Sequence, residues 1–227
     1  MQRATAATAA PVRAPRELSD LVGFAVFIGL ALLTGARHPE ISLLLAPVLL
    51  YELAVATSFL IRGRAVRTSV GVPQRLAAYG GTFLMPVALP LLAELAPSAL
   101  TRTDNAVAFG VGAALRMGGL MLCVWGVWHL RRSFSVEPAA RALVTSGPYA
   151  FFRHPLYVGY AATFGGGLLQ FPSAPYAALV AAWFALTFYR IRYEEAVLEA
   201  AFPEYADYRH RVGLLAPRFM PTRRRPA

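Results

Sequence analysis

The stretch GPYAFFRHPLYVG, residues 147–159, is the most informative part of the sequence for the fold. It places a polar pair, Arg153 and His154, between two long apolar segments. A second polar pair, Glu194-Glu195, follows the next apolar block along the chain. Ionisable groups at the edge of a membrane-like segment are costly, so they usually have a functional role. We therefore expect the chemistry of the chain to lie at these two pairs.

The composition around that stretch indicates a membrane protein. Hydrophobic residues make up 57% of the 227 residues and charged residues only 15%, whereas a soluble domain carries about 25% charged residues. The length suits one compact unit. The single cysteine, Cys123, lies in an apolar run, which excludes a disulfide framework and a cysteine-based metal site.

The formal charge of +10 comes from arginine, because all 22 lysine-or-arginine positions hold arginine. The arginines cluster between apolar runs, a distribution that fits anionic lipid head groups rather than nucleic acid. The start of the chain contains no apolar core of signal-peptide length. We expect residues 1–17 to form a disordered cytoplasmic arm and residues 222–227 a basic tail at the lipid surface.

Six apolar runs predict an all-α fold, a polytopic bundle of about six transmembrane helices. A span needs about 20 apolar residues, so the fifth run is short, and its Gly165-Gly166-Gly167 allows local unwinding. Helical patterns on both sides of Pro203 predict two short cytoplasmic C-terminal helices over the site. The six runs are residues 18–36, 41–61, 76–100, 106–130, 156–171 and 174–189.

Arginines decide the orientation of the bundle. The N-terminal arm, the segments after the second and fourth runs and the C-terminal tail are rich in arginine, whereas the segments between them carry one or none. The positive-inside rule places arginine-rich segments, and with them both termini, in the cytoplasm. We therefore expect a multi-pass protein of the bacterial inner membrane whose two polar pairs share the cytoplasmic face.

Further motifs flank the two polar pairs in a fixed order. Together they resemble the isoprenylcysteine carboxyl methyltransferase and phospholipid methyltransferase superfamily over residues 128–221. The chain departs from the family's Phe-Gly at Phe202-Pro203, in a turn that holds no reactive group. The matching motifs are LRRSFS at 130–135, LVTSGPY at 143–149, RHP-x-Y-x-G at 153–159, EE-x-x-L at 194–198 and Y-x-x-Y at 205–208.

The resemblance implies an integral-membrane enzyme that uses S-adenosyl-L-methionine. We divide the chain accordingly into a four-span membrane region, residues 18–130, and a methyltransferase-like region with two spans, residues 131–221. Catalysis is assigned to Arg153, Glu194 and Glu195. The residues expected to bind the cofactor are Leu143, Val144, Thr145, Gly147, Tyr149, His154, Pro155, Tyr157, Glu194 and Glu195.

Two interpretations of Arg153 and His154 are open. Pro155 disfavours a helical backbone at His154, so the pair sits in a turn whose backbone N–H and C=O groups are free to bind an adenine edge or a ribose. The Arg153 guanidinium can fork onto a carboxylate of the cofactor or of an acceptor. The alternative is that both side chains only snorkel to the membrane interface.

Glu194 and Glu195 are adjacent on a predicted helix and point about 100° apart. The two carboxylates therefore cannot both face the same ligand atom. One is expected to bind the ammonium or the ribose hydroxyls of the cofactor, and the other to pair with Arg153 or to act as a general base. The alternative is an exposed acidic pair at a helix start, balanced by Arg190 or Arg192.

Two further charges, Glu52 and Arg116, lie near the middle of separate apolar runs. Neither can face lipid at acceptable cost, so we expect both to face the bundle interior, where they can pair with each other. Such a pair would either fix the packing or belong to an acceptor site. His129 and His210 lack companion ligands at metal spacing, and we expect no metal site.

The leading interpretation is a membrane methyltransferase that takes its cofactor from the cytoplasm and a lipophilic acceptor from the bilayer. A carboxylate or thiolate acceptor needs only orientation, whereas an amine must lose a proton, which a glutamate can take. One alternative is a membrane sterol or isoprenoid reductase, which shares a His-Pro-x-Tyr element and uses NADPH. Another is a non-enzymatic membrane scaffold or transporter, against which the gathering of polar motifs at one edge argues.

Overall fold

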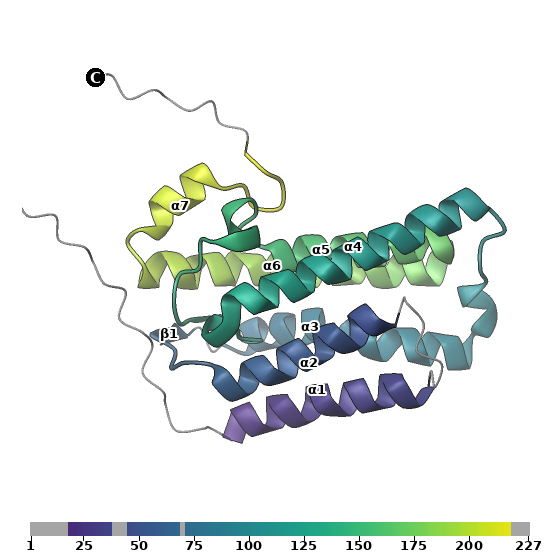
Figure 1. Ribbon diagram of the computed structural model, residues 1–227, viewed down its shortest axis with the longest axis horizontal. Helices are drawn as coiled ribbons and strands as arrows, with labels where there is room; N and C mark the ends of the chain where they lie inside the picture. The colour runs from purple at the N-terminus through teal and green to yellow at the C-terminus, as the bar shows by residue number, and fades with distance from the viewer. Residues whose placement is uncertain (1–17, 38–44, 69–70, 219–227) are drawn as a thin grey trace, which may run out of the picture.

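The computed structural model describes residues 18–37, 45–68 and 71–218, which fold as a bundle of helices (Figure 1). The all-α fold predicted from the sequence is thus confirmed. Two very short strands pair antiparallel beside the bundle. The elements are α1 (Leu18–Arg37), α2 (Ala46–Ile61), β1 (Arg67–Thr68), α3 (Val72–Leu95), η1 (Pro97–Leu100), α4 (Ala106–Leu130), η2 (Arg131–Ser133), β2 (Ala139–Ala140), η3 (Gly147–Ala150), α5 (Pro155–Gln170), α6 (Ala174–Ala201) and α7 (Tyr205–Arg211), where η denotes a 3-10 helix.

Six of the helices, α1 to α6, overlap the six apolar runs, although α3 begins and ends earlier than its run and residues 41–44 of the second run lie outside the described residues. Within the described residues, 3 helices are long and apolar enough to cross a membrane, namely α3, α4 with the 3-10 turn that follows it, and α6. The helices α1 and α2 are apolar but shorter. The 16-residue α5 is helical throughout, with no unwinding at its three successive glycines. The chain is therefore a polytopic membrane protein of the predicted class, and the number of crossings stays a prediction.

The C-terminal part differs from the expectation in one respect. The sequence predicted two short helices after the last span, yet α6 runs unbroken to Ala201. The helix continues because an ion pair between Arg190 and Glu194 joins successive turns at i,i+4 spacing, and no breaker occurs before Pro203. Only α7 is a separate short helix, and it packs on the end of α6 (Figure 1).

Glycines bring α4 and α5 into close contact. A Cβ added at Gly119 of α4 would lie 2.4 Å from the carbonyl oxygen of Gly159 on α5. A Cβ at Gly112 would lie 2.5 Å from the carbonyl oxygen of Gly166. Small residues allow helix backbones to approach each other within a membrane. The start of α5, and the polar turn before it, are thereby held against α4.

Aromatic side chains fill much of the remaining interior. Trp183 of α6 is almost fully buried and donates its indole N–H to the Gly81 carbonyl oxygen of α3 at 3.0 Å. Phe27 of α1 and Phe59 of α2 stack with ring centroids 6.0 Å apart in a second buried cluster. Within a bilayer such contacts act through close packing rather than through water exclusion.

The two charges within apolar helices are not partners, contrary to the pairing that the sequence suggested. Glu52 of α2 is buried and accepts a hydrogen bond from the Thr34 hydroxyl of α1 at 3.3 Å. Arg116 of α4 donates to Oε1 of Gln170, at the end of α5, at 2.7 Å. The charges diverge because α2 packs on α1 whereas α4 packs mainly on α5. Both still face a neighbouring helix, as expected.

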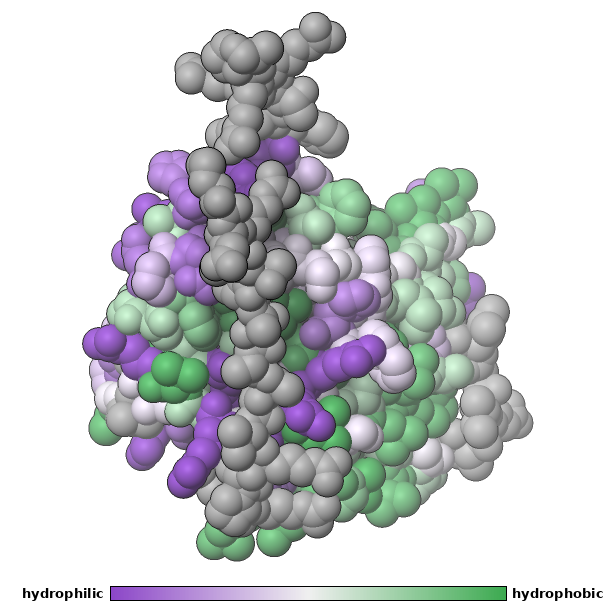
Figure 2. All heavy atoms as spheres, turned by 60° about the vertical axis from the view of Figure 1, so that its left-hand side comes forward, coloured by the Kyte–Doolittle hydropathy of each residue, from purple (hydrophilic) through white to green (hydrophobic). Residues whose placement is uncertain are grey.

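The arginine-rich segments gather at one end of the bundle. The start of α1, the connections from α2 to α3 and from α4 to α5, and α7 all lie at the left-hand end of Figure 1. Figure 2 turns this end toward the viewer, and hydrophilic residues gather there while hydrophobic residues cover the flanks. Both polar pairs therefore share one end of the molecule. The predicted arm and tail, residues 1–17 and 222–227, lie outside the described residues.

Candidate active site

The turn before α5 is non-helical at His154, as Pro155 predicts, but its ψ angle falls short of the extended range that proline favours. His154 adopts φ −127° and ψ 65°, and α5 begins at Pro155. The backbone N–H groups of this turn are not free, however. The N–H of Arg153 donates to the Gly213 carbonyl oxygen at 2.9 Å, and that of His154 to the Leu214 carbonyl oxygen at 3.2 Å. The segment after α7 thus fixes the turn, and these two N–H groups are not available to a ligand.

Glu194 is held by groups from α5 and α6. Its Oε1 accepts a hydrogen bond from the Tyr157 hydroxyl at 2.7 Å and another from Nε of Arg190 at 2.8 Å. The Nδ1 atom of His154 lies 3.6 Å from its Oε2. The Glu194 side chain is only 19% exposed. This carboxylate therefore belongs to a partly buried polar network and not to an exposed acidic pair.

Glu195 contacts the other side of His154. Its Oε1 accepts hydrogen bonds from Nε2 of His154 at 2.9 Å and from the Tyr205 hydroxyl at 2.5 Å. Nη1 of Arg153 lies 3.0 Å from its Oε2. One glutamate thus pairs with Arg153, as expected, while the contact of His154 with both carboxylates was not predicted. Across the described residues, His, Cys, Asp and Glu side chains form no group of three or more that could hold a metal ion.

Arg190 joins the glutamates to the rest of the bundle. Its buried guanidinium donates through Nη1 to the Ala78 carbonyl oxygen and the Thr82 hydroxyl of α3, at 3.2 Å and 2.8 Å. Its Nη2 donates to the Val136 carbonyl oxygen at 2.6 Å. With the bond to Glu194, every part of the guanidinium is engaged. Arg190 therefore fixes where the Glu194 carboxylate stands.

Three tyrosines beside this network are kept in the neutral form. Burial, reinforced by the hydrogen bond to Glu195, raises the pKa of Tyr205 well above its ordinary value. Burial also raises the pKa of Tyr208, although the nearby Arg153 lowers it in part. Burial likewise raises the pKa of Tyr149, whose carbonyl oxygen accepts from the Tyr208 hydroxyl at 2.7 Å. The phenols of Tyr205 and Tyr208 therefore act as hydrogen-bond donors.

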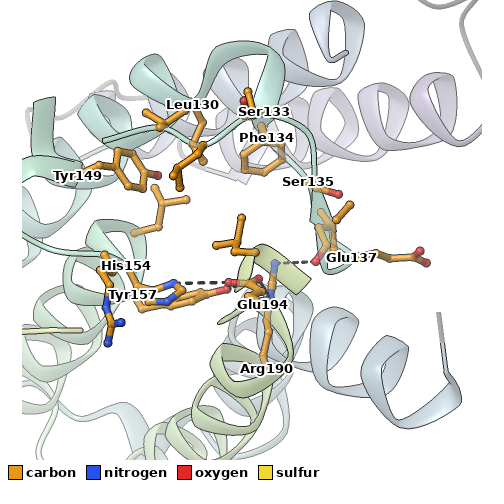
Figure 3. Close-up of a pocket in the computed structure, with 18 of the residues that line it drawn as sticks. Leu130, Ser133, Phe134, Ser135, Glu137, Tyr149, His154, Tyr157, Arg190 and Glu194 are labelled. Carbon is orange, nitrogen blue, oxygen red and sulfur yellow. Dashed lines mark hydrogen bonds and ion pairs between the residues drawn. The ribbon is translucent and has the colours of Figure 1, made fainter. Parts of the chain in front are cut away.

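A cavity of about 140 Å³ lies between this network and the segment that follows α4. Figure 3 shows residues 133–135 on one side of it, with His154, Tyr157, Glu194 and Arg190 on the opposite side. The cavity thus brings Arg153, His154 and Glu194 together with the motif that begins at residue 130. The predicted site residues that line it are Leu143, Val144, Tyr149, Arg153, His154, Tyr157 and Glu194.

Four predicted site residues do not line the cavity. Gly147 has a φ of 61°, and a Cβ there would lie 2.3 Å from the His129 ring, so this glycine shapes the loop. Pro155 starts α5, and Glu195 orients Arg153 and His154 from behind. Thr145 is exposed on the loop.

The structure also brings in residues that the sequence interpretation did not assign to the site. Arg190 lines the cavity, and its place four residues before Glu194 was an available signal for an ion pair. Residues 133–137 line it as well, and the tyrosines of the Y-x-x-Y motif join them. Tyr51 of α2 reaches the cavity from the N-terminal half, where no motif could have indicated it.

Arg153 retains unused hydrogen-bonding capacity. Its side chain is only 8% exposed, and its Nε has no hydrogen-bond partner within the described part of the chain. Its Nη1 is close to Glu195 but lacks hydrogen-bond geometry, so that contact is an ion pair. A buried donor left unpaired costs about 1–3 kcal/mol. A guanidinium that lines a cavity in this state is well suited to bind an anionic ligand.

Comparison with known proteins identifies relatives of this region. Residues 107–205 match the family model of the phospholipid methyltransferases. The chain is 44% identical over 78 residues to the cobalt-zinc-cadmium resistance protein CzcN of Cupriavidus metallidurans, which covers 34% of this chain and 36% of that protein. It is 42% identical over 78 residues to the nickel-cobalt-cadmium resistance protein NccN of Alcaligenes xylosoxydans xylosoxydans, again covering 34% of this chain and 36% of that protein. The match thus spans little more than a third of these curated relatives.

Among solved structures, the chain is similar to the eukaryotic intramembrane Ras methyltransferase, isoprenylcysteine carboxyl methyltransferase. The sequence identity is 18% and the TM-score 0.45, over 88% of this chain and 85% of the other. That likeness is a general one, and the family rests on the matched residues. The match begins in α4, upstream of the motifs. Residues 107–205 thus match the phospholipid methyltransferase family, one of the two that the motifs of the sequence resembled.

Proposed function

We propose that the chain is an integral-membrane methyltransferase that uses S-adenosyl-L-methionine and methylates a lipophilic acceptor at the cytoplasmic face. The observation that carries this proposal is the cavity that both Arg153 and Glu194 line. The family match of residues 107–205 supports the reaction class. The arginine-rich end at which the cavity lies supports the cytoplasmic face (Figure 1).

The residues of the cavity fit the charges of this cofactor. The methionine part of the cofactor carries a carboxylate and an ammonium group, and the cavity wall offers a guanidinium with an unpaired donor and a carboxylate. We assign Arg153 to the carboxylate and Glu194 to the ammonium. The loop at Leu143 and Val144 supplies a wall for the adenosine. When bound, the cofactor supplies a methyl group on a positively charged sulfur.

The protein's own contribution is positioning and exclusion of water. Tyr157 and Arg190 hold the Glu194 carboxylate in one place, and Glu195 holds Arg153 and His154. Ligand pockets usually measure about 300–1,000 Å³, and this cavity is smaller at about 140 Å³. We therefore expect the walls of the cavity to move apart when the cofactor binds.

A binding titration tests the proposal directly. Purified full-length protein should bind S-adenosylhomocysteine, and Glu194→Gln should weaken that affinity at least about tenfold, because a hydrogen bond to a charged group contributes about 1.5–3 kcal/mol. Arg153→Lys should weaken it as well, since lysine lacks the planar fork. The control is Glu199→Gln, which removes an exposed carboxylate of α6 outside the cavity. Binding of NADPH without binding of S-adenosylhomocysteine would instead favour a reductase.

The acceptor is approached by a separate assay. Membranes containing the protein are supplied with a labelled methyl donor and with candidate acceptors of three kinds, namely lipophilic carboxylic acids, thiols and amines. A carboxylate or thiolate is already nucleophilic, whereas an amine needs a base. A rate that rises with pH for an amine alone would show that the acceptor must lose its proton before methyl transfer. Transfer to none of them would leave cofactor binding intact and reject the acceptor class.

A further inference from the structure

A second and larger cavity, of about 700 Å³, lies beside the first. Its volume falls in the range of about 300–1,000 Å³ typical of ligand pockets. The two cavities share a wall, made of segment 135–137 together with Phe27 and Ala139. Neither Arg153, His154 nor Glu194 lines the second cavity. Figure 3 shows the Glu137 side chain extending away from His154 and Glu194. The second cavity is therefore a distinct space.

One part of this cavity is apolar and open toward the outside of the bundle. Leu18, Val22 and Val26 succeed one another by one helical turn along α1, and these side chains are 39–78% exposed. Phe27 and Phe83, whose ring centroids lie 6.0 Å apart, line it further in. A groove of this kind along a helix suits a flexible hydrocarbon chain.

The other part is strongly basic. Arg62, Arg64 and Arg141 line it, against a single lining carboxylate, that of Glu137. Arg62 forms an ion pair with Asp20, and the Glu137 carboxylate accepts a hydrogen bond from the Tyr79 hydroxyl at 2.8 Å. Arg64 is exposed to solvent. The lining thus carries an excess of positive charge. It includes the start of α1 and the segment after α2, which lie at the same end of the molecule as the arginine-rich loops (Figure 1).

We propose that this second cavity is a binding site for an anionic phospholipid. One acyl chain lies along Leu18, Val22 and Val26, and the phosphate lies among the arginines that follow α2 and precede α5. Basic pockets at the cytoplasmic side of membrane proteins bind anionic lipid head groups, and arginine pairs with phosphate through parallel hydrogen bonds. The inference does not need methyl transfer, since none of the groups assigned to the cofactor takes part in it.

The test measures lipid binding to full-length protein in neutral detergent, by native mass spectrometry and by the shift of the melting temperature. Phosphatidylglycerol should bind more tightly than phosphatidylcholine, and inorganic phosphate at equal concentration should give no shift. Arg64→Gln should weaken phosphatidylglycerol binding about fivefold, because one basic residue near an anionic lipid contributes about 1 kcal/mol. Arg192→Gln removes an exposed arginine of α6 outside the cavity and should leave the affinity unchanged.

The apolar part is tested by filling it. Val22→Trp should reduce binding, whereas Leu32→Trp, on the same helix but outside the cavity, should not. Equal binding of phosphatidylcholine, or full affinity in Arg64→Gln, would overturn the role of charge. A shift with inorganic phosphate alone would reduce the site to a phosphate site. Methylation of the bound lipid would make the cavity an acceptor site and would reject a separate lipid site.

Discussion

Nε of Arg190 donates a hydrogen bond to Oε1 of Glu194 at 2.8 Å, one turn away on the same helix. The remaining donors of Arg190 engage α3 and the segment between α4 and α5. One guanidinium thus connects the carboxylate of the candidate site to two other parts of the fold. The side-chain exposures of the pair, 9% and 19%, mark it as a largely buried ion pair.

Arg190→Met should therefore destabilise the protein strongly. Removing one partner of a buried ion pair costs about 3–5 kcal/mol, because the other charge is left without compensation. The control is Arg209→Met, whose ion pair with Glu199 is about half exposed on both sides and should contribute no more than about 1 kcal/mol. Unfolding in mixed detergent micelles measures both. Equal losses in the two variants would contradict the structural role of Arg190.

The glycines of α4 provide a second prediction with a neighbouring control. A Cβ at Gly119 would overlap the backbone of α5, so Gly119→Ala must push the two helices apart. This overpacking should lower the free energy of unfolding by about 1–3 kcal/mol. A Cβ at Gly118 would meet nothing within 4 Å. Gly118→Ala should leave stability unchanged or raise it by up to about 1 kcal/mol through helix propensity.

The same pair of variants reports on function. Because α4 supports the start of α5 and the turn of Arg153 and His154, Gly119→Ala should also weaken binding of S-adenosylhomocysteine. Gly118→Ala should bind it as the wild type does. Isothermal titration of both variants makes the comparison, and full affinity in Gly119→Ala would show that the site does not depend on this helix contact.

Tyr205 should make the stability of the fold depend on alkaline pH. Its pKa is raised by burial and by the hydrogen bond to Glu195, so the folded state holds the phenolic proton more tightly than the unfolded chain does. That contribution is complete below the unfolded value of about 10 and decreases as the pH rises above it. At pH 8, Tyr205→Phe should lower the free energy of unfolding by about 1.5–3 kcal/mol, which is the contribution of a hydrogen bond to a charged group.

Above pH 10 the difference in free energy of unfolding between wild type and Tyr205→Phe should become smaller. Denaturation at pH 8 and at pH 10.5 provides the two values for each protein. A difference that stays constant across this range would mean that Tyr205 has the same pKa in the folded and unfolded states, which would contradict the prediction.

The sequence predicted the elements whose signals are local. Apolar runs located α1 to α6, and Pro155 predicted the non-helical turn at His154. Helix geometry alone predicted that the side chains of Glu194 and Glu195 point in different directions. These features depend on residues that are close together in the chain. Hydrophobic periodicity and the backbone restriction imposed by proline both act over that short range.

Features that depend on distant contacts were not predictable. The backbone N–H groups of the polar turn looked free, but the segment after α7 takes them. Glu52 and Arg116 looked like partners, but each turns to another helix. Tyr51 reaches the cavity because α2 packs against α4, which no local pattern encodes.

The orientation in the membrane supplies the final prediction, and it rests on where the arginine-rich segments lie. Ser146, in the loop before α5, and Ser98, in the 3-10 turn after α3, are both exposed and lie at opposite ends of the bundle (Figure 1). With the arginine-rich end in the cytoplasm, an impermeant thiol reagent should label Ser98→Cys in intact cells and Ser146→Cys only after permeabilisation. The native Cys123 is buried and gives little background. The reverse pattern would place the candidate site outside the cell, away from any cytoplasmic supply of cofactor.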